Sequence, residues 1–188
     1  MIQQTTLETE RLVLRPLTPD DAATVARLAG SREVADTTIS IPHPYSEAQA
    51  REWIAVCTTK SSAGKAIVFG VVTRDDAPLI GAVGLREIDA EHSQAEMGFW
   101  VGVQSWGKGY ATEAARRVIR YAFKELKLNR VYAHHMVRNP ASGRVLEKVG
   151  MKREGLLRQR VRKWGAFEDV VLLAILHDDW AQMNGKVP

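Results

Sequence analysis

The stretch VQSWGKGYATEAARR, residues 103–117, places two glycines and a lysine directly ahead of a segment with helical periodicity. Gly107 and Gly109 allow the backbone to turn tightly and to bring its N–H groups close to a ligand. The first turn of a helix adds unpaired N–H donors and a partial positive charge, and Lys108 can add a full charge. This combination indicates a site for an anion, and pyrophosphate is the group that it suits best.

The phosphate-binding loop of nucleotide hydrolases, G-x-x-x-x-G-K-[ST], is the first motif to compare with this stretch. Gly102, Gly107 and Lys108 match the motif. Gly109 then stands where the motif requires the hydroxyl that binds magnesium. A nucleotide-binding protein of this kind is therefore the weaker alternative.

Two further glycine motifs apply to the same residues. The dinucleotide fingerprint G-x-G-x-x-G matches Gly107 and Gly109, but Thr112 replaces its third glycine. The pattern Q-x-x-G-x-G/A is complete, with Gln104 ahead of the two glycines. A glycine-rich turn without a ligand also remains open, because motifs of this length are weak.

Three side chains outside this stretch are candidates for moving protons. Glu96 precedes the apolar run MGFWV, where an acidic residue is either a charge at the end of a strand or a buried, functional group. His134 and His135 are adjacent in a predicted strand, so their side chains should face opposite sides of a sheet. One of them could assist proton transfer, although a histidine in a strand is more often a hydrogen-bonded packing residue.

The strands that would position these residues follow from alternating or short apolar runs. Turns predicted at Asp75 and Asp76 and at residues 89–92 are short, which favours an antiparallel meander. Strands are predicted around Leu12 and Leu14 and over residues 65–74, 78–88, 93–103, 129–137, 151–164 and 166–176.

The predicted helices are marked by their start signals. One helix follows Thr18 as N-cap with Pro19 at its first position, and another follows Ser46, which has capping-box spacing to Gln49. The long helix after the glycines has one apolar face, formed by Ala111, Ala114, Ala115, Val118, Ile119, Ala122, Phe123 and Leu126.

A short helix with Asn139 as N-cap and Gly150 as its stop, and a last helical turn around Trp180, complete the elements. Residues 31–45 hold two prolines and are predicted to be a loop. The order β-α-α-β-β-β-α-β-α-β-β predicts an α/β (α+β mixed) fold, with a single central mixed, mostly antiparallel sheet flanked by helices.

Length and composition fit one soluble domain spanning residues 1–188. The net charge of +4 is mild and not gathered into a block, so it suits a small anionic ligand better than a nucleic acid. The single Cys57 excludes an internal disulfide, and no Cys/His cluster has the spacing of a zinc site. No apolar run is long enough to span a membrane. We therefore expect a cytoplasmic protein without a metal, a membrane contact or a nucleic-acid partner.

The segments AEMGFWV, QSWGKGYATEAARRVIRYAFKELKLNRVYA and NPASGRVLEKVGMKREGLLR, in this order, resemble the GCN5-related N-acetyltransferase (GNAT) family. Within it, the chain is similar to the ribosomal-protein alanine N-acetyltransferases (RimJ/RimL type), from LETERLVLRPLTPDDA to DVVLLAILHDDW. The resemblance implies a sheet whose fourth and fifth strands splay apart to admit acetyl-CoA. It also implies direct transfer of the acetyl group to a primary amine, without a metal.

The resemblance also implies roles for individual residues. Residues 104–110 would hold the pyrophosphate, and the strand segment 99–103 would pair with the pantetheine arm. Ser142 would lie near the thioester sulfur and protonate the leaving thiolate, and Glu96, facing the acceptor, would take the amine proton through water. The cofactor-binding residues implied are Phe99, Val101, Val103, Gln104, Trp106, Gly107, Lys108, Gly109, Tyr110, Asn139 and Ser142.

Some features limit the transfer of a detailed mechanism. Leu146 stands where many members of the family carry a catalytic Tyr, and the strand DVVLLAIL lacks the Tyr often found there. A noncatalytic coenzyme A-binding module is the alternative function. We expect an α-amine acceptor, a protein N-terminus or a small amine, and a homodimer. The 3′-phosphate of coenzyme A could be bound by Arg116, Arg117, Arg120 or Arg144, although the simpler role of these arginines is to form a solvated helix face. The acceptor site could be lined by Trp53, Trp100 or Trp106, although the simpler role of these large aromatic residues is core packing.

Overall fold

The computed structural model describes residues 5–74 and 78–185, and the turn predicted at Asp75 and Asp76 lies outside them. Eight strands form one sheet in the order β1-β2-β3-β4-β5-β6-β8-β7. Every neighbouring pair is antiparallel except β5 and β6, which are parallel. The mixed, mostly antiparallel sheet is thus confirmed. The strands are β1 (Leu7–Glu8), β2 (Leu12–Pro16), β3 (Ile67–Thr73), β4 (Gly81–Asp89), β5 (Gln94–Val101), β6 (Arg130–Met136), β7 (Lys152–Lys163) and β8 (Ala166–Leu176).

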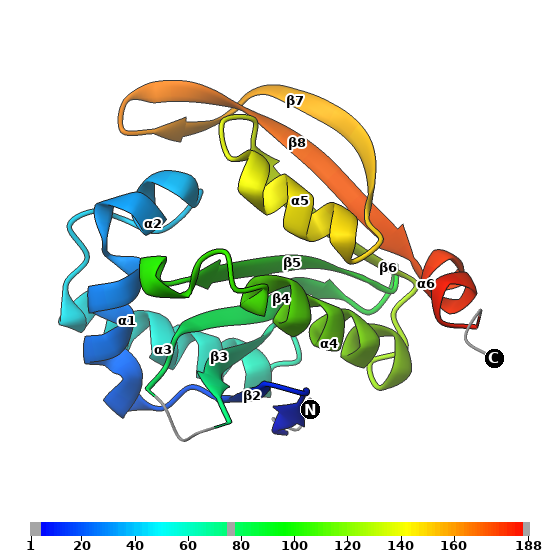
Figure 1. The fold of residues 1–188 in the computed structure, drawn as a ribbon, viewed down its shortest axis with the longest axis horizontal. Coiled ribbons are helices and arrows are strands. Elements are labelled where there is room, and N and C mark those ends of the chain that lie inside the picture. Colours follow the sequence, from blue (N-terminus) through cyan, green and yellow to red (C-terminus); the bar gives the residue numbers. More distant parts are fainter. Residues whose placement is uncertain (1–4, 75–77, 186–188) are drawn as a thin grey trace.

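Helices cover both faces of the sheet, and each face has its own core (Figure 1). One core packs α4 against the face that presents Val83 and Leu85 of β4. The other packs α1 and α3 against the opposite face, which presents Ala82 and Trp100. No helix among the described residues is long and apolar enough to cross a membrane. The helices are α1 (Ala22–Ala29), α2 (Arg32–Thr37), α3 (Glu47–Ser62), α4 (Tyr110–Lys124), α5 (Pro140–Lys148) and α6 (His177–Asn184), with 3-10 turns at Pro19–Asp21 and Val103–Ser105.

The local signals that predicted the helix ends are confirmed in the structure. The Ser46 hydroxyl accepts from the Gln49 N–H at 3.2 Å, and the Gln49 side chain accepts from the Ser46 N–H at 2.9 Å. The Asn139 side chain accepts from the Ser142 N–H at 3.1 Å. Gly150 follows α5 with a φ of +94°, the left-handed conformation expected of a helix stop.

The prediction that residues 31–45 form only a loop is wrong, because they contain α2. Ser31 caps this helix, accepting from the Val34 N–H at 3.4 Å. Val34 and Ala35 are 1% and 0% exposed, so tertiary burial stabilises the helix. Six residues are too few to show helical periodicity, and both prolines of the segment come after the helix.

Strands β5 and β6 pair over only three residues before they separate. Gln94, Ala95 and Glu96 pair with Arg130, Val131 and Tyr132, and no further register follows. Residues 97–101 of β5 and 133–136 of β6 therefore line a gap in the middle of the sheet. Counted without the short β1, these are the fourth and fifth strands, so the expected splay is confirmed.

Candidate active site

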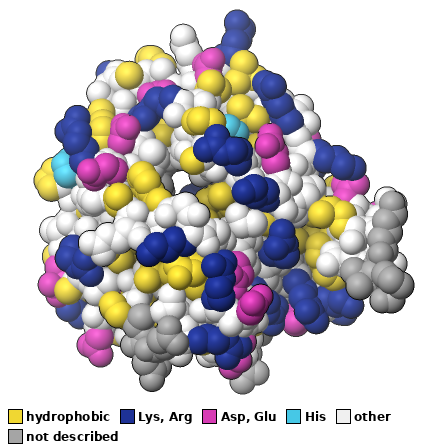
Figure 2. Space-filling model, in the orientation of Figure 1, with side chains coloured by type: hydrophobic (Ala, Val, Ile, Leu, Met, Phe, Trp, Pro, Cys, Tyr) yellow, Lys and Arg dark blue, Asp and Glu magenta, His cyan; other side chains and the backbone are white. Residues whose placement is uncertain are grey.

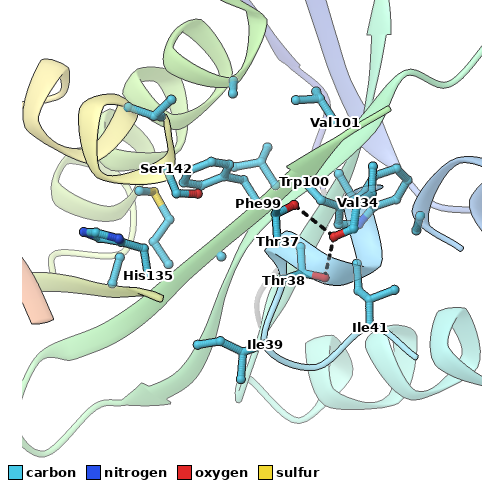
Figure 3. A pocket seen from close by; sticks show the side chains of 18 of the residues that line it. Val34, Thr37, Thr38, Ile39, Ile41, Phe99, Trp100, Val101, His135 and Ser142 are labelled. Atoms are coloured by element: carbon cyan, nitrogen blue, oxygen red, sulfur yellow. Dashed lines mark hydrogen bonds between the residues drawn. The ribbon is translucent and has the colours of Figure 1, made fainter. Parts of the chain in front are cut away.

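A cavity of about 550 Å³ fills the gap between β5 and β6. Its lining residues come from both faces of the sheet: α5 and the start of α4 at one end, α1, α2 and the following loop at the other. Figure 3 shows Ser142 and His135 on one side of β5 and Val34, Thr37, Thr38, Ile39 and Ile41 on the other. The cavity therefore joins two sides of the sheet, and a ligand on each side can reach the same gap.

The glycine stretch forms the end of the cavity beside α4. Gly107 and Gly109 have φ values of +74° and +80°, which favour glycine, and Gly109 is the N-cap of α4. The first backbone bond into the helix runs from the Glu113 N–H to the Gly109 carbonyl at 3.0 Å. No described residue accepts a hydrogen bond from the six N–H groups of residues 107–112. Such a row of unpaired donors at a helix start fits a pyrophosphate.

Arg11, which sequence reasoning missed, fixes this stretch from the neighbouring strand end. Its guanidinium donates to the Lys108 carbonyl at 3.0 Å and to Glu113 at 2.7 Å, and it lies 4.9 Å above the Tyr110 ring. The Thr9 hydroxyl and the Arg11 N–H donate to the other oxygen of Glu113 at 2.7 and 2.9 Å. Burial alone would raise the pKa of Glu113, but these bonds outweigh it and lower the pKa. The Glu113 charge is thus fully compensated beside a site suited to an anion.

Lys and Arg side chains gather on the face that carries α4 and α5, around a small opening (Figure 2). Among the arginines considered for the 3′-phosphate, Arg144 lines the cavity, whereas Arg116, Arg117 and Arg120 do not. Arg116 donates to the Lys148 carbonyl at 3.1 Å and so joins α4 to α5. The positive charge at this end therefore comes from scattered side chains on two helices.

The free edge of β5 offers backbone groups to the gap. The Gly102 N–H donates to the Ile80 carbonyl at 2.9 Å, on the side of β4. Because backbone groups alternate along an antiparallel pair, those of Met97, Phe99 and Val101 face away from β4, toward the gap. The Trp106 indole N–H donates to the Val101 carbonyl at 2.7 Å, so this carbonyl is already paired. The carbonyl of Met97 and the N–H and carbonyl groups of Phe99 lie beyond the last pair with β6, Glu96 with Tyr132, and remain to receive an extended ligand.

Glu96 forms a buried ion cluster at the other end of the cavity. The side chain is 8% exposed, and its Oε1 accepts from Arg86 Nη2 at 2.6 Å and meets His134 Nδ1 at 3.0 Å. Burial alone would raise the pKa of Glu96, but the bonds to His134 and Arg86 outweigh it and lower the pKa to about 2. The carboxylate therefore keeps its charge and has little affinity for a proton.

His134 is oriented by this carboxylate. A neutral imidazole that meets a carboxylate through Nδ1 must carry its proton there, which leaves Nε2 as an acceptor. His135 instead packs under α5, because a Cβ on Gly143 would lie 2.9 Å from its Nε2. The two histidines thus face opposite sides of the sheet, as predicted, and His134 is the one beside Glu96.

Ser142 and Asn139 lie at the start of α5, on the cavity wall. The Ser142 hydroxyl has no hydrogen-bond partner among the described residues. The Asn139 amide is more constrained, because it caps α5 and also donates to the Thr37 carbonyl of α2 at 2.8 Å. Asn139 therefore ties the two ends of the cavity together, and Ser142 is the residue with a hydroxyl free to act.

The structure brings most of the predicted site residues together around the cavity. Eight of them line the cavity: Glu96, Phe99, Val101, Trp106, Gly107, Gly109, Asn139 and Ser142. Val103, Gln104, Lys108 and Tyr110 belong to the glycine stretch but not to the lining. Leu146, at the position of the missing Tyr, is 1% exposed in the core. Arg86 and the loop after α2 were missed, because nothing local in the sequence marks them.

Known proteins resemble this chain in sequence and in fold. Residues 11–152 match the family model described as the acetyltransferase (GNAT) domain. The uncharacterized N-acetyltransferase p20 of Bacillus licheniformis is 34% identical over 94% of this chain and 98% of its own length. The [ribosomal protein uS5]-alanine N-acetyltransferase of Escherichia coli is 30% identical over 62% of this chain and 61% of its own length. The structure of spermidine N-acetyltransferase from Vibrio cholerae, in complex with CoA and spermine, superposes with a TM-score of 0.80 at 27% identity, covering 92% of this chain and 99% of that one.

Proposed function

The chain belongs to the GNAT acetyltransferase family and is an acetyl-CoA-dependent N-acetyltransferase, and from this premise we propose that its acceptor is an α-amine, of a protein N-terminus or of a small amine. One observation carries the proposal. The cavity through the sheet has unpaired N–H groups at one end and a single histidine-carboxylate pair, with no stronger base, at the other. The matches also favour an enzyme over the noncatalytic module and the nucleotide-binding protein.

Acetyl-CoA is proposed to enter on the face of α4 and α5. The N–H groups of residues 107–112 suit the pyrophosphate, with Gln104, Lys108 and Tyr110 beside it. The free carbonyl of Met97 and the free N–H and carbonyl groups of Phe99 suit the amides of the pantetheine arm. Arg144, the cavity-lining arginine, is our candidate for the 3′-phosphate. This arrangement would leave the thioester in the gap between β5 and β6.

The amine is proposed to enter from the opposite face and to attack the thioester directly. The new C–N bond replaces the C–S bond, and much of the rate comes from holding the two reactants together. A backbone N–H at the free edge of β5 would polarise the carbonyl as charge develops on its oxygen. Because the reaction is a direct transfer, the chain needs no covalent nucleophile.

Two groups are proposed to handle the protons. Glu96 holds the charge that orients His134, and His134 Nε2, directly or through water, takes the proton that the attacking amine loses. The low pKa of Glu96 makes the pair, not the carboxylate alone, the better proton acceptor. The Ser142 hydroxyl gives its proton to the leaving thiolate and regains one from solvent. Ser142 is thus proposed in the role predicted from the sequence, whereas Glu96 is proposed to orient His134 rather than to take the amine proton itself.

The preference for an α-amine follows from the pKa of its protonated form. Only a neutral amine attacks, and an α-amine has a reference pKa of about 7.7–8.0, against about 10.4 for lysine. A usable fraction of α-amines is therefore neutral at pH 7 without help, whereas very little lysine is. A site with only a histidine as base suits the α-amine.

A matched pair of peptides tests this proposal. One has a free N-terminus and no lysine, and the other has a blocked N-terminus and one lysine. We expect kcat/KM at pH 7.5, followed by release of coenzyme A thiol, to be at least about tenfold higher for the free N-terminus. Faster acetylation of the blocked lysine peptide would contradict the proposal.

The proposal also covers domain organisation, cellular location and oligomeric state. Residues 1–188 are proposed to act as one N-acetyltransferase domain, supported by the single continuous sheet. A cytoplasmic location is proposed as well, and the free thiol of Cys57 is compatible with it, because thiols stay reduced in that compartment. A homodimer is supported by the exposed apolar side chains of the β7–β8 hairpin, Leu156, Trp164 and Phe167. Light scattering at micromolar concentration that gives the 20.9 kDa mass of one chain would reject the dimer.

A further inference from the structure

We propose that the acceptor end of the cavity selects an amine carried next to one apolar group of residue size, such as an N-terminal leucine, methionine or phenylalanine, and disfavours polyamines. The inference rests on the proposed function in one respect, that the amine enters from the face of α1 and α2. It goes further because it names the group beside the amine.

The walls at this end are mainly apolar. They come from five segments: α1, α2, the loop after α2, α3 and β5. The residues that matter here are Ala29, Val34, Ile39, Ile41, Trp53 and Trp100. A pocket with such walls gains from removing an apolar group from water and offers little to a polar one.

Two of the polar side chains of the wall are turned away from a ligand, whereas the hydroxyls of Ser40 and Tyr45, which also line the cavity, have no hydrogen-bond partner among the described residues. Thr37 and Thr38 lie at the end of α2, and both hydroxyls donate to the Val34 carbonyl, at 3.1 and 2.9 Å (Figure 3). Their donors are therefore paired with the backbone. These threonines do not supply the hydrogen bonds that a polar side chain of the acceptor would need.

The charges of the cavity disfavour a second ammonium group. Among the described residues that line the cavity, Glu96 is the only acidic one. Its Oε1 already meets Arg86 and His134, and Arg86 adds positive charge at this end of the cavity. A polyamine would have to place a second cation between mainly apolar walls, where the only carboxylate among the described lining residues is already paired with Arg86, which is costly.

The wall is held in place before any ligand binds. Lys163 donates to the Ile41 carbonyl at 2.6 Å, Asn139 donates to the Thr37 carbonyl at 2.8 Å, and Arg138 pairs with Asp36 at 2.8 Å. These contacts fix both ends of the loop that carries Ile39 and Ile41. Since the 550 Å³ must also take the acetyl and pantetheine groups, the space left suits one residue-sized group.

The test uses peptides that differ only in the first residue: Leu, Met, Phe, Ser, Asp or Lys, with spermidine as the polyamine. We expect kcat/KM for the Leu peptide to exceed that for the Ser peptide by about tenfold or more, and spermidine to be the poorest acceptor. Dissociation constants of the same acceptors for the enzyme saturated with coenzyme A give a second readout, and we expect the same order.

Variants locate the effect. Ile41→Asp should lower kcat/KM for the Leu peptide about tenfold or more and improve the Lys peptide, because it adds a charge to the wall. Val56→Asp is the matched control on α3, where Val56 is 43% exposed and does not line the cavity, and it should leave both rates unchanged. Thermal unfolding shows whether each variant is folded. If Ile41→Asp does not fold, Ile39→Ala carries the test, with a smaller loss for the Leu peptide.

Equal rates for all first residues, or spermidine as the fastest acceptor, would overturn the inference. Its failure is separable from that of the proposed function. Isopentylamine and 1,4-diaminobutane form a pair without an α-amine, one apolar and one carrying a second charge. If lysine side chains prove to be the acceptors but isopentylamine still exceeds diaminobutane, the α-amine proposal fails and the apolar subsite stands. If free N-termini are acetylated at equal rates whatever the first residue, the apolar subsite is rejected and the α-amine proposal stands.

Discussion

Beside each end of the cavity lies one carboxylate that an arginine holds, and the two pairs differ in which oxygens they leave unbonded. At the α4 end, Arg11 and its neighbours occupy both oxygens of Glu113. At the α2 end, Arg86 and His134 both meet Oε1 of Glu96, and no described residue bonds to its Oε2. The Arg11–Glu113 pair therefore has no carboxylate oxygen left for another group. The Arg86–Glu96 pair keeps one unbonded carboxylate oxygen and lies beside the imidazole of His134, so both could contact a bound amine.

The ends also differ in the groups that they offer to a ligand. The α4 end offers backbone N–H groups of one continuous stretch, residues 107–112. The α2 end offers side chains from segments far apart in the chain. Backbone recognition is insensitive to most substitutions except those of the glycines, whereas side-chain recognition can be retuned one residue at a time. We therefore expect mutations at the two ends to separate cofactor binding from acceptor choice and chemistry.

The largest effect is expected at the backbone end, from Gly109→Asp. The change places a side chain at a φ of +80° and a negative charge where the pyrophosphate is proposed to lie. We expect acetyl-CoA affinity to fall at least about a hundredfold, measured by calorimetry. Gly64→Asp is the matched control, because Gly64 has a φ of +71° and open space around its Cβ, remote from the cavity lining. Unchanged affinity in folded Gly109→Asp would remove the pyrophosphate from this stretch.

The next effect is expected at the ion cluster, from Glu96→Gln. The low pKa of Glu96 means that its charge is present throughout the working range and is lost only as the pH falls toward about 2. Glu96 therefore does not titrate in the activity profile, and its removal acts through His134. We expect a loss in kcat/KM of about a hundredfold at pH 6.5, smaller at pH 9, where a neutral amine needs less help.

Glu87→Gln is a matched control for Glu96→Gln, since Glu87 is exposed and contacts the Tyr132 hydroxyl instead, at 3.3 Å. It should leave the profile unchanged. A Glu96→Gln defect of equal size at every pH would identify Glu96 as a residue that only orients the acceptor.

A smaller effect is expected from Ser142→Ala, between the two ends. Thiolate is a fair leaving group, so losing the proton donor should lower kcat about tenfold to a hundredfold, with kcat/KM falling in parallel. Acetyl-CoA affinity should hold, because the Ser142 N–H that bonds to Asn139 remains. Steady turnover with only a raised KM for acetyl-CoA would make Ser142 a cofactor contact.

The contrast between the ends also explains what could be predicted from the sequence. Gly107, Gly109, Ser46 and Asn139 act on neighbours a few residues away, so their spacing was enough to place the glycine stretch and the helix ends. Glu96 stood out as a lone acid before an apolar run, but its partner His134 is 38 residues away, and the resulting pKa depends on burial and on that pairing.

The parts that could not be predicted depend on contacts between distant segments. Helix α2 owes its stability to the burial of Val34 rather than to a periodic pattern. The acceptor walls are ordinary apolar residues whose meeting is decided by the topology of the sheet. Arg11 contacts Glu113 across 102 residues, and nothing near it in the sequence marks it as part of a phosphate site.

The smallest effect is expected from the pair of Arg11 and Glu113. Arg11→Met removes the bond to the Lys108 carbonyl and leaves the Glu113 charge beside the proposed pyrophosphate. Acetyl-CoA affinity should fall about tenfold, with kcat at saturation unchanged, because the pair lies outside the gap where the reaction is proposed to occur. Glu113→Gln alone should have a weaker effect.

The double variant, Arg11→Met with Glu113→Gln, separates the two roles of Arg11. If Arg11 acts mainly by compensating the charge of Glu113, the double variant regains most of the acetyl-CoA affinity. If Arg11 acts mainly through its bond to the Lys108 carbonyl, the double variant binds as weakly as Arg11→Met. Calorimetry at two salt concentrations sharpens the result, since added salt screens the charge of Glu113 that Arg11→Met leaves uncompensated, but does not restore the lost bond to the Lys108 carbonyl. A fall in kcat with unchanged affinity would contradict both roles and the separation of the two ends.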